Sequence, residues 1–239
     1  MKYLGIKRNI QLLMSKLRNS NIYVEIDKLK PTQCAVGMDH VNRKVSELQT
    51  LKKENDGQQK VSTFLKTHAA PVVLKGDDIY LIDNHHLCRA LHELGDDFFK
   101  DVPLENGITS NKPIIYIKIV SDLSALEKQN QFWEKMSEEK WVHPYDKYGK
   151  GPVPFDNIPT KVKELDDDIF RSVAAVVKIQ GGFKKTFIPY AEFQWANYFR
   201  SCWPEDTNTH THSFDHIVEK SMEHAVHSKA KDLPGYVGK

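Results

Sequence analysis

Cysteine is scarce in this chain of 239 residues, with Cys34, Cys88 and Cys202 too far apart to form a CxxC pair. That spacing argues against a disulfide framework or a structural zinc site and suits a reducing compartment. Long apolar runs are also missing, so the sequence predicts no membrane span. The first residues, MKYLGIKRNIQLLMSKL, lack the continuous apolar stretch of a secretion signal. We therefore expect a cytoplasmic protein that does not bind membranes.

A strong charge of one sign is missing as well, because the formal net charge is only +2. A dedicated binder of the nucleic-acid backbone usually carries a strongly basic face, so nucleic acid is not the favoured partner. A local basic patch would still allow a nuclease. Hydrophobic residues make up 40% of the chain, which is enough for one large domain or two small ones.

The first half of the chain alternates between strand and helix patterns. Apolar residues at helical spacing predict a helix within residues 1–21. Strands are then expected at 22–26, 72–74, 79–82 and 113–120, and helices at 41–53 and at 87–94, the latter ended by Gly95. Residues 53–61 are polar and are expected to form a loop. This order predicts a compact α+β domain at 22–121.

The second half is mainly helical. Helical patterns are expected at 122–140, 162–179, 190–203 and 213–230, with a connector rich in proline and glycine at 141–160. We expect this portion, residues 122–239, to pack on the small sheet of the first half.

The sequence IYLIDNHHLCRAL, residues 79–91, predicts a sharp corner between a strand and a helix. The first amides of a helix and the positive end of its dipole favour an anion. Asp83 is a candidate Mg²⁺ ligand, and His85 and His86 are candidate donors to phosphate oxygens. The alternative interpretation is that Asp83 and Asn84 only cap the helix and that both histidines are surface residues.

The order of elements around this corner resembles the ParB/sulfiredoxin superfamily. The segments that show this resemblance are PVVL at 71–74 and YLIDNHHLCRAL at 80–91. The resemblance implies a small mixed sheet and a helix whose N-terminus binds phosphate at residues 83–86. Members that phosphorylate free serine carry DGHHR here, so Asn84 replaces a glycine. Asparagine tolerates left-handed backbone angles better than most residues.

A narrower resemblance covers nearly the whole chain. The segments PTQCAVG at 31–37, FWEKM at 132–136, LDDDIFRS at 165–172, GGF at 181–183, YAEFQWANYFR at 190–200 and LPGY at 233–236 occur in order. They are similar to those of a bacterial family named ParB-like putative nucleases. Shared fold does not by itself establish activity.

The superfamily resemblance carries over only in part. Thr32 and Gln33 lie in the segment that corresponds to the substrate loop of the serine kinases. Gln33 stands where those enzymes have a catalytic glutamate. An amide does not accept a proton at neutral pH, which argues against serine kinase activity by that mechanism. Cys88 lies beyond the turn that holds the cysteine of sulfiredoxin, and we expect it to be a small buried hydrophobe. The helix-turn-helix domain of partition proteins is not recognisable.

Four residues outside the corner are further candidates. Lys44 and Arg89 are assigned to phosphate binding. Arg171 either forms an ion pair on a helix begun by Asp166–Asp168 or binds a phosphate or carboxylate group. Glu192 would supply the carboxylate that Gln33 lacks if its helix packs over the corner, whereas Trp195 is expected in the core. The histidines of HTHSFDH, 210–216, are expected to be solvated.

These observations favour binding of a nucleotide such as ATP, ADP or CTP, or of another phosphorylated small molecule. We expect Mg²⁺-dependent phosphoryl transfer or phosphodiester hydrolysis, with Asp83 as the metal ligand and with His85, His86 and Glu192 as catalytic groups. The alternatives are a DNA or RNA nuclease, a noncatalytic nucleotide-binding or partition-like protein, and an exported toxin.

Overall fold

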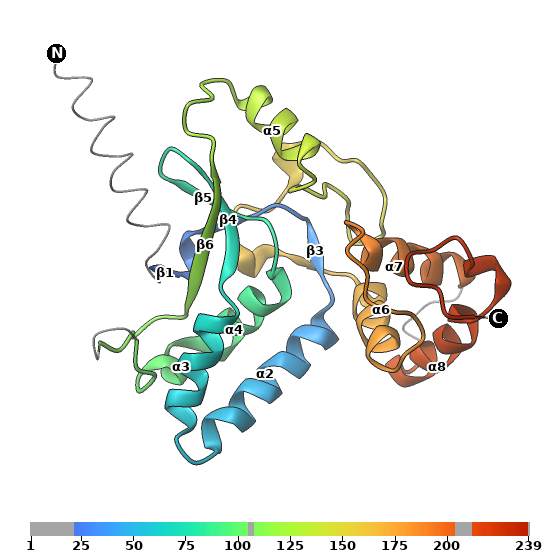
Figure 1. Ribbon diagram of the computed structural model, residues 1–239, viewed down its shortest axis with the longest axis horizontal. Helices are drawn as coiled ribbons and strands as arrows, with labels where there is room; N and C mark the ends of the chain where they lie inside the picture. Colours follow the sequence, from blue (N-terminus) through green and yellow to red (C-terminus); the bar gives the residue numbers. More distant parts are fainter. Residues whose placement is uncertain (1–21, 105–107, 204–211, 239) are drawn as a thin grey trace. The chain divides into compact units, whose positions relative to one another are not determined.

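The computed structural model describes residues 22–104, 108–203 and 212–238 (Figure 1). The helix expected within residues 1–21 lies outside these residues. The chain divides into two compact units. Unit 1 contains residues up to 34, 44–144 and 154–165, and unit 2 contains 35–43, 145–153 and 166–239. The chain thus passes between the units several times. The segments predicted from the sequence were 1–21, 22–121 and 122–239.

Unit 1 is built on a mixed five-stranded sheet with the order β1-β6-β4-β5-β2. The strands are β1 (Ile22–Glu25), β2 (Leu29–Pro31), β4 (Ala70–Lys75), β5 (Asp78–Leu81) and β6 (Ile114–Asp122). β4 and β5 form the expected antiparallel hairpin, and β2 pairs with β5 in parallel. β6 pairs in parallel with β4 and antiparallel with β1. The mixed sheet confirms the predicted α+β class.

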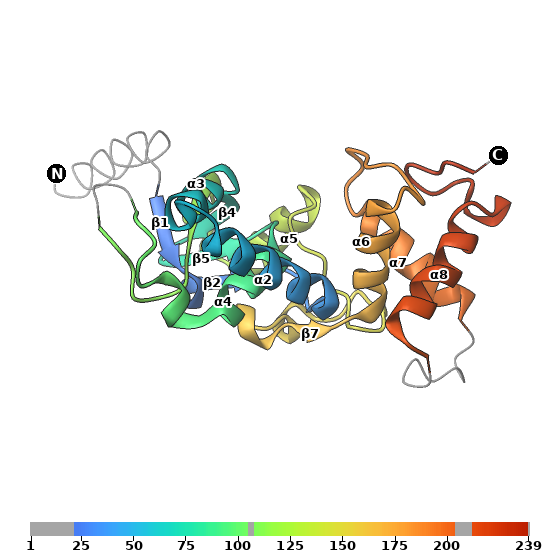
Figure 2. The same ribbon diagram turned by 90° about the horizontal axis from the view of Figure 1, so that it is seen from below.

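Helices α2 (Met38–Lys53), α3 (Gly57–Thr67) and α4 (His85–Phe99) lie together in front of the strands in Figure 2. α3 and α4 both pack against β6. α4 contains a break at Gly95, where φ is 69°, so its regular part ends where the sequence predicted. The short continuation to residue 99 buries Phe98 and Phe99.

The polar loop expected at 53–61 is wrong, because α3 begins at Gly57. Val61 and Leu65 are buried in this helix. The polar residues that precede them in the sequence make the helical pattern hard to recognise. The chain turns sharply into α3 through Asp56, whose φ is 57°. A Cβ atom at position 57 would lie 2.1 Å from the carbonyl oxygen of Lys52, so the turn requires glycine.

Helix α5 (Gln129–Glu138) is shorter than the helix expected at 122–140, and β6 extends to Asp122. The Phe132 ring of α5 lies 4.6 Å from the Tyr80 ring of β5, measured between centroids. On the other side, the Trp133 ring stacks on Phe155 at 4.8 Å. Aromatic contacts thereby join α5 to β5 and to residue 155 within unit 1.

Unit 2 contains a two-stranded parallel ribbon, β3 (Ala35–Val36) with β7 (Asp166–Asp167), and the helices α6 (Ile169–Ile179), α7 (Ala191–Cys202) and α8 (Phe214–Ala225). Asp166 and Asp167 therefore form a strand rather than the first turn of a helix, and Asp168 is the residue that caps α6. Trp195 is buried as expected, and its indole N–H donates to the carbonyl oxygen of Pro234 at 2.7 Å. The Phe183 ring stacks on it at 4.4 Å.

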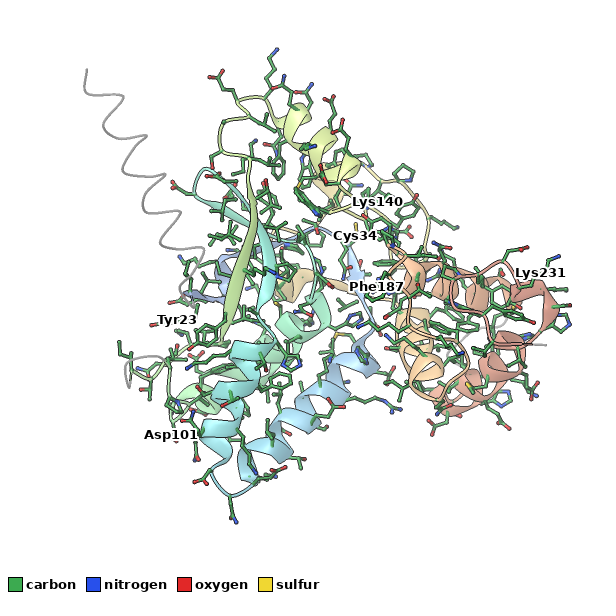
Figure 3. All side chains as sticks on the ribbon, in the orientation of Figure 1. Tyr23, Cys34, Asp101, Lys140, Phe187 and Lys231 are labelled. Atoms are coloured by element: carbon green, nitrogen blue, oxygen red, sulfur yellow. The ribbon has the colours of Figure 1, made fainter. Side chains whose placement is uncertain are left out.

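All three cysteines lie in the described residues and none forms a disulfide. Cys34 (labelled in Figure 3) and Cys88 are buried, whereas Asp101 and Lys140, also labelled there, are exposed. Burial, together with the nearby Asp83, raises the pKa of the Cys88 thiol, so this residue is an unreactive part of the core. Within the described residues no helix is both long and apolar enough to cross a bilayer.

Candidate functional site

The corner between β5 and α4 is a tight turn at Asp83 and Asn84. Asn84 has φ 64° and ψ 24°, the left-handed conformation in which asparagine can replace glycine. Its backbone N–H donates to Asp83 Oδ1 at 2.7 Å. Its side-chain Nδ2 also donates to the His68 carbonyl oxygen over a long 3.4 Å. This turn directs the first amides of α4, which have no acceptor inside a helix, away from the strand.

His85 is a buried contact residue at this corner, with 5% of its surface exposed. Its Nε2 accepts the backbone N–H of Thr32 at 3.2 Å, and the Thr32 hydroxyl donates to the Leu81 carbonyl oxygen at 2.8 Å. A ring nitrogen that accepts an N–H carries no proton, so Nε2 does not donate to a phosphate. His85 instead fixes the loop after β2 against the corner. His86, the next residue, is partly exposed.

The predicted substrate loop is anchored from both sides. The Thr32 carbonyl oxygen accepts the N–H of His143 at 2.8 Å, and Gln33 forms a parallel bridge with His143. Gln33 is only 5% exposed, and its Nε2 has no hydrogen-bond partner among the described residues. A buried amide nitrogen in that state is normally satisfied by an ordered water or a ligand.

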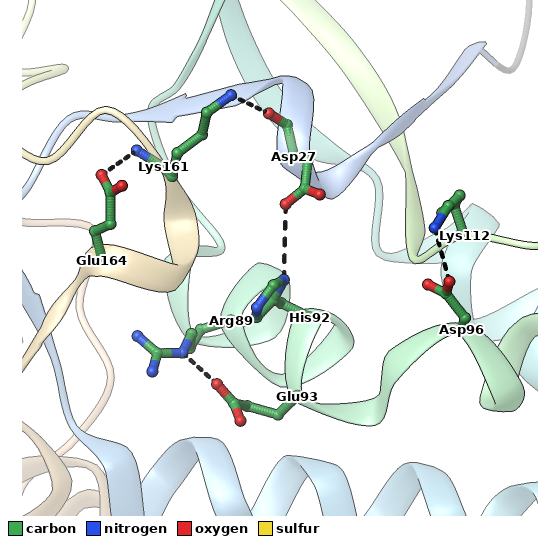
Figure 4. A network of polar contacts seen from close by, with 8 residues as sticks. All are labelled: Asp27, Arg89, His92, Glu93, Asp96, Lys112, Lys161 and Glu164. Atoms are coloured by element: carbon green, nitrogen blue, oxygen red, sulfur yellow. Dashed lines mark hydrogen bonds and ion pairs between the residues drawn. The ribbon is translucent and has the colours of Figure 1, made fainter.

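Arg89 holds α4 in place within unit 1. Its Nε donates to Glu93 Oε1 at 2.7 Å, and a terminal guanidinium nitrogen donates to the Leu165 carbonyl oxygen at 2.9 Å. These contacts occupy part of the guanidinium that the sequence assigned to phosphate. Figure 4 shows the surrounding polar network, in which Lys161 Nζ donates to the Asp27 carbonyl oxygen at 2.8 Å. The network ties α4 to the segment after β1 and to residues 161–165.

Lys44 lies on α2 and lines a pocket of unit 1 together with Leu87, which belongs to the first turn of α4. The structure therefore brings Lys44 to the neighbourhood of the corner. Asp83 is exposed, so its carboxylate is accessible to a ligand at this surface. In the described part of the chain no three His, Cys, Asp or Glu side chains gather in a metal-binding arrangement. Asp83 is a single protein ligand. It can therefore hold only a Mg²⁺ ion whose other ligands include the phosphates of a bound molecule.

Arg171 and Glu192 belong to unit 2 and contact residues of that unit. Arg171 is buried, with its guanidinium carbon 3.4 Å from the centroid of the Phe193 ring. Glu192 forms an ion pair with Lys178. Burial acts to raise the pKa of the Glu192 carboxyl, but Lys178, Arg171 and His40 outweigh it and the pKa is lowered. The carboxylate role proposed for Glu192 at the corner stays a prediction.

The lowered pKa of Glu192 predicts a pH dependence of stability. The fold favours the ionised form of this carboxyl. Its contribution to the stability of unit 2 is therefore fully present at pH values above the ordinary pKa of glutamate, and it is lost as the pH falls through the lowered pKa. Because the Glu192 side chain is 37% exposed, Glu192→Gln should reduce the free energy of unfolding by at most about 1 kcal/mol at neutral pH, and by less at a pH below the lowered pKa. Urea unfolding at both pH values tests this, and an equal difference at the two would contradict it.

Asp168 caps α6, as the sequence predicted for the acidic run, and it also forms an ion pair that the sequence did not identify. The sequence predicted an ion pair of this run with Arg171, but Asp168 Oδ2 accepts a hydrogen bond from Arg200 of α7 at 2.6 Å. Its Oδ1 accepts the Phe170 N–H at 3.0 Å and so caps α6. Burial raises the pKa of the Asp168 carboxyl, against the opposing effect of Arg200 and Arg171. The only sequence signal was that both residues lie in the motifs LDDDIFRS and YAEFQWANYFR.

Comparison with known proteins places these sites in a family. A family model described as "Putative ParB-like nuclease" matches residues 22–201. The chain belongs to this family. The match includes the corner of unit 1 and helices α6 and α7 of unit 2, and it confirms the resemblance that the sequence motifs indicated.

The chain is also similar to a solved structure, described as the crystal structure of protein Atu1540 from Agrobacterium tumefaciens. The two are 31% identical, with a TM-score of 0.73, over 92% of this chain and 98% of that chain. A search of curated proteins returned no match. The similarity extends over both units, so this ParB-like chain shares its fold with that protein along nearly its whole length.

Proposed function

We propose that this ParB-like protein binds a nucleotide or another phosphorylated ligand at the corner formed by residues 83–86, and that it catalyses Mg²⁺-dependent phosphoryl transfer or phosphodiester hydrolysis there. The observation that carries the proposal is the turn at Asn84. It combines a left-handed residue, an exposed carboxylate and the N-terminus of the regular part of α4 at one point of the surface. Helix amides and dipole together favour a phosphate group at such a point.

The residues of the corner would have separate roles. The amides of the first turn of α4 would hold phosphate oxygens, and His86 would donate to them. Asp83 would bind a Mg²⁺ ion that neutralises phosphate charge. His85 would act indirectly, since it positions the Thr32 loop, and Gln33 would offer its amide N–H groups to the ligand. Lys44 would approach the phosphates from α2.

A general base is the missing part of this mechanism. Gln33 cannot accept a proton at neutral pH, so another group must activate the nucleophile if the reaction requires a base. Phosphoryl transfer depends mainly on positioning and charge stabilisation, which reduces that requirement. Glu192, the carboxylate that the sequence suggested, belongs to unit 2 and pairs with Lys178, so its role as that base stays a prediction.

Replacement of the two adjacent histidines tests the proposal, and the two variants are expected to behave differently. His86→Ala should abolish binding of ATP, ADP or CTP with Mg²⁺ while the protein remains folded. His85→Ala should lower the free energy of unfolding by about 1–3 kcal/mol, because the buried Thr32 N–H loses its acceptor. Titration calorimetry and thermal unfolding measure these effects. Unaltered ligand binding in His86→Ala would disprove the phosphate site.

A nuclease is the second candidate, because the family description carries that name. The nearly balanced charge of the chain counts against tight binding of long nucleic acids. Incubation with single- and double-stranded oligonucleotides and Mg²⁺ distinguishes the candidates. Cleavage that Asp83→Ala removes would favour the nuclease, and turnover of a mononucleotide alone would favour phosphoryl transfer.

A further inference from the structure

An apolar tip projects from unit 2 in the loop between α6 and α7. It consists of Phe187, Ile188 and Pro189, all of them exposed, and we call it the 187–189 tip. Phe187, labelled in Figure 3, has a relative exposure of 103%, so the described residues cover neither face of its ring. Ile179, at the end of α6 from which the loop leaves, is 69% exposed. Exposed apolar side chains gathered in this way are typical of interaction surfaces.

The chain segment that carries the tip is attached to the core of unit 2. Phe183 is buried, and the backbone N–H of Lys184 donates to the Gly235 carbonyl oxygen at 2.8 Å. A Cβ atom at position 235 would lie 2.1 Å from the Lys184 carbonyl oxygen, so this close approach requires glycine. Nearer the tip, the Ile188 N–H donates to the Thr186 hydroxyl oxygen at 3.3 Å. An anchored base therefore presents the tip at a defined place on unit 2.

The charge around the tip is positive. Residues 179–191 include Lys184 and Lys185 but no acidic residue. Both lysines are exposed, and neither forms an ion pair within the part of the chain that the structure describes. The first acidic residue after this segment, Glu192, pairs with Lys178 instead. Because a second copy of this surface would carry the same charge and be repelled, the expected partner is anionic.

We propose that the 187–189 tip inserts into the interface of a bilayer that contains anionic lipids, while Lys184 and Lys185 bind the lipid phosphates. Binding of this kind grows with the apolar area inserted and with the attraction between basic residues and anionic lipids. A projecting tip enters a fluid bilayer without a preformed cavity in its partner. Ile188 and Pro189 offer no aromatic face to a nucleobase, which favours lipid over single-stranded nucleic acid.

This surface contact is compatible with the scarcity of apolar runs in the sequence. The absence of a long apolar run argues against a membrane span, but a tip of three residues needs no such run to reach the interface. The expectation that the protein does not bind membranes rested on that absence alone. The proposal is also independent of the phosphate site at the corner, because the tip belongs to unit 2 and the corner to unit 1.

Flotation of the full chain with lipid vesicles tests the proposal. One set of vesicles contains phosphatidylcholine alone, and the other contains equal parts of phosphatidylcholine and phosphatidylglycerol. The wild type should float only with the anionic set. Phe187→Ser should weaken this binding by roughly tenfold or more, because the inserted apolar area is lost. Val226→Ser is the matched control, since Val226 is a 49% exposed apolar residue of unit 2 outside the loop, and it should bind like the wild type.

A second pair of variants tests the lysines. The double variant Lys184→Glu/Lys185→Glu should also lose roughly tenfold or more in affinity for the anionic vesicles, because it reverses the charge beside the tip. Lys229→Glu/Lys231→Glu makes the same change of charge at two exposed lysines elsewhere in unit 2, and it should have a much smaller effect. Equal losses in the two double variants would mean that overall charge, and not the tip, attracts the protein.

Three results would overturn the proposal. The first is a wild type that does not float with the anionic vesicles, and the second is a Phe187→Ser variant that floats as well as the wild type. The third comes from a parallel titration with a single-stranded oligonucleotide. If the oligonucleotide binds, Phe187→Ser removes that binding and the vesicles do not bind, the tip is a nucleic-acid contact instead.

Discussion

Asp168→Ala is expected to destabilise unit 2 by about 3–5 kcal/mol, because removal of one member of a buried ion pair leaves its partner without compensation. The Asp168 side chain is 7% exposed and that of Arg200 is 22% exposed. The partial exposure of Arg200 places the loss toward the lower end of this range. The substitution also removes the cap on α6, which contributes about 1 kcal/mol in comparable helices.

Two control variants separate these contributions. Asp168→Asn keeps an oxygen that can accept the Phe170 N–H but removes the charge, so it should lose the ion pair and retain the cap. Asp166→Ala removes a neighbouring carboxylate whose side chain is 60% exposed, and it should alter stability by less than about 0.5 kcal/mol. The expected order of stability is wild type, Asp166→Ala, Asp168→Asn and then Asp168→Ala.

Hydrogen exchange read by mass spectrometry measures this effect in each unit separately. Asp168→Ala should accelerate exchange in peptides from α6 and α7 and leave peptides from β4 and β6 protected. Equal acceleration in both sets would mean that the units unfold together. Full protection of α6 and α7 in Asp168→Ala would show that the Asp168–Arg200 contact adds nothing to stability.

Local chemistry explains which parts of the fold could be predicted from the sequence. The β4–β5 hairpin, the corner and the end of α4 at Gly95 each depend on residues within a few positions of one another. α3 was missed because its buried residues, such as Val61 and Leu65, follow a polar stretch that reads as a loop. β7 was missed because a strand of two residues has no periodicity of its own.

The roles of individual site residues depended on contacts between distant parts of the chain. His85 and Thr32 are 53 positions apart, and Asp168 and Arg200 are 32 apart. Neither separation leaves a local pattern, so His85 was assigned to phosphate and Arg171 was paired with the acidic run. The sequence therefore located the corner but could not tell the buried histidine from the partly exposed one.

Substitution of Asn84 tests the geometry on which the corner depends. Asn84→Gly places a glycine at the left-handed position and should preserve both fold and ligand affinity, because glycine adopts a φ of 64° without strain. Asn84→Val should cost about 2 kcal/mol or more, since a β-branched residue is strongly disfavoured in the left-handed region. Relief of that strain would rotate the start of α4 and redirect its first amides.

The ligand-binding consequence distinguishes geometry from side-chain chemistry at this position. If the backbone turn creates the phosphate site, Asn84→Gly retains affinity for ATP with Mg²⁺ and Asn84→Val loses it, while both variants lack the amide. If the Asn84 side chain itself binds the ligand, the two variants lose affinity equally. Calorimetric titration beside thermal unfolding separates these outcomes, because a variant that remains folded yet does not bind has lost only the orientation of the helix amides.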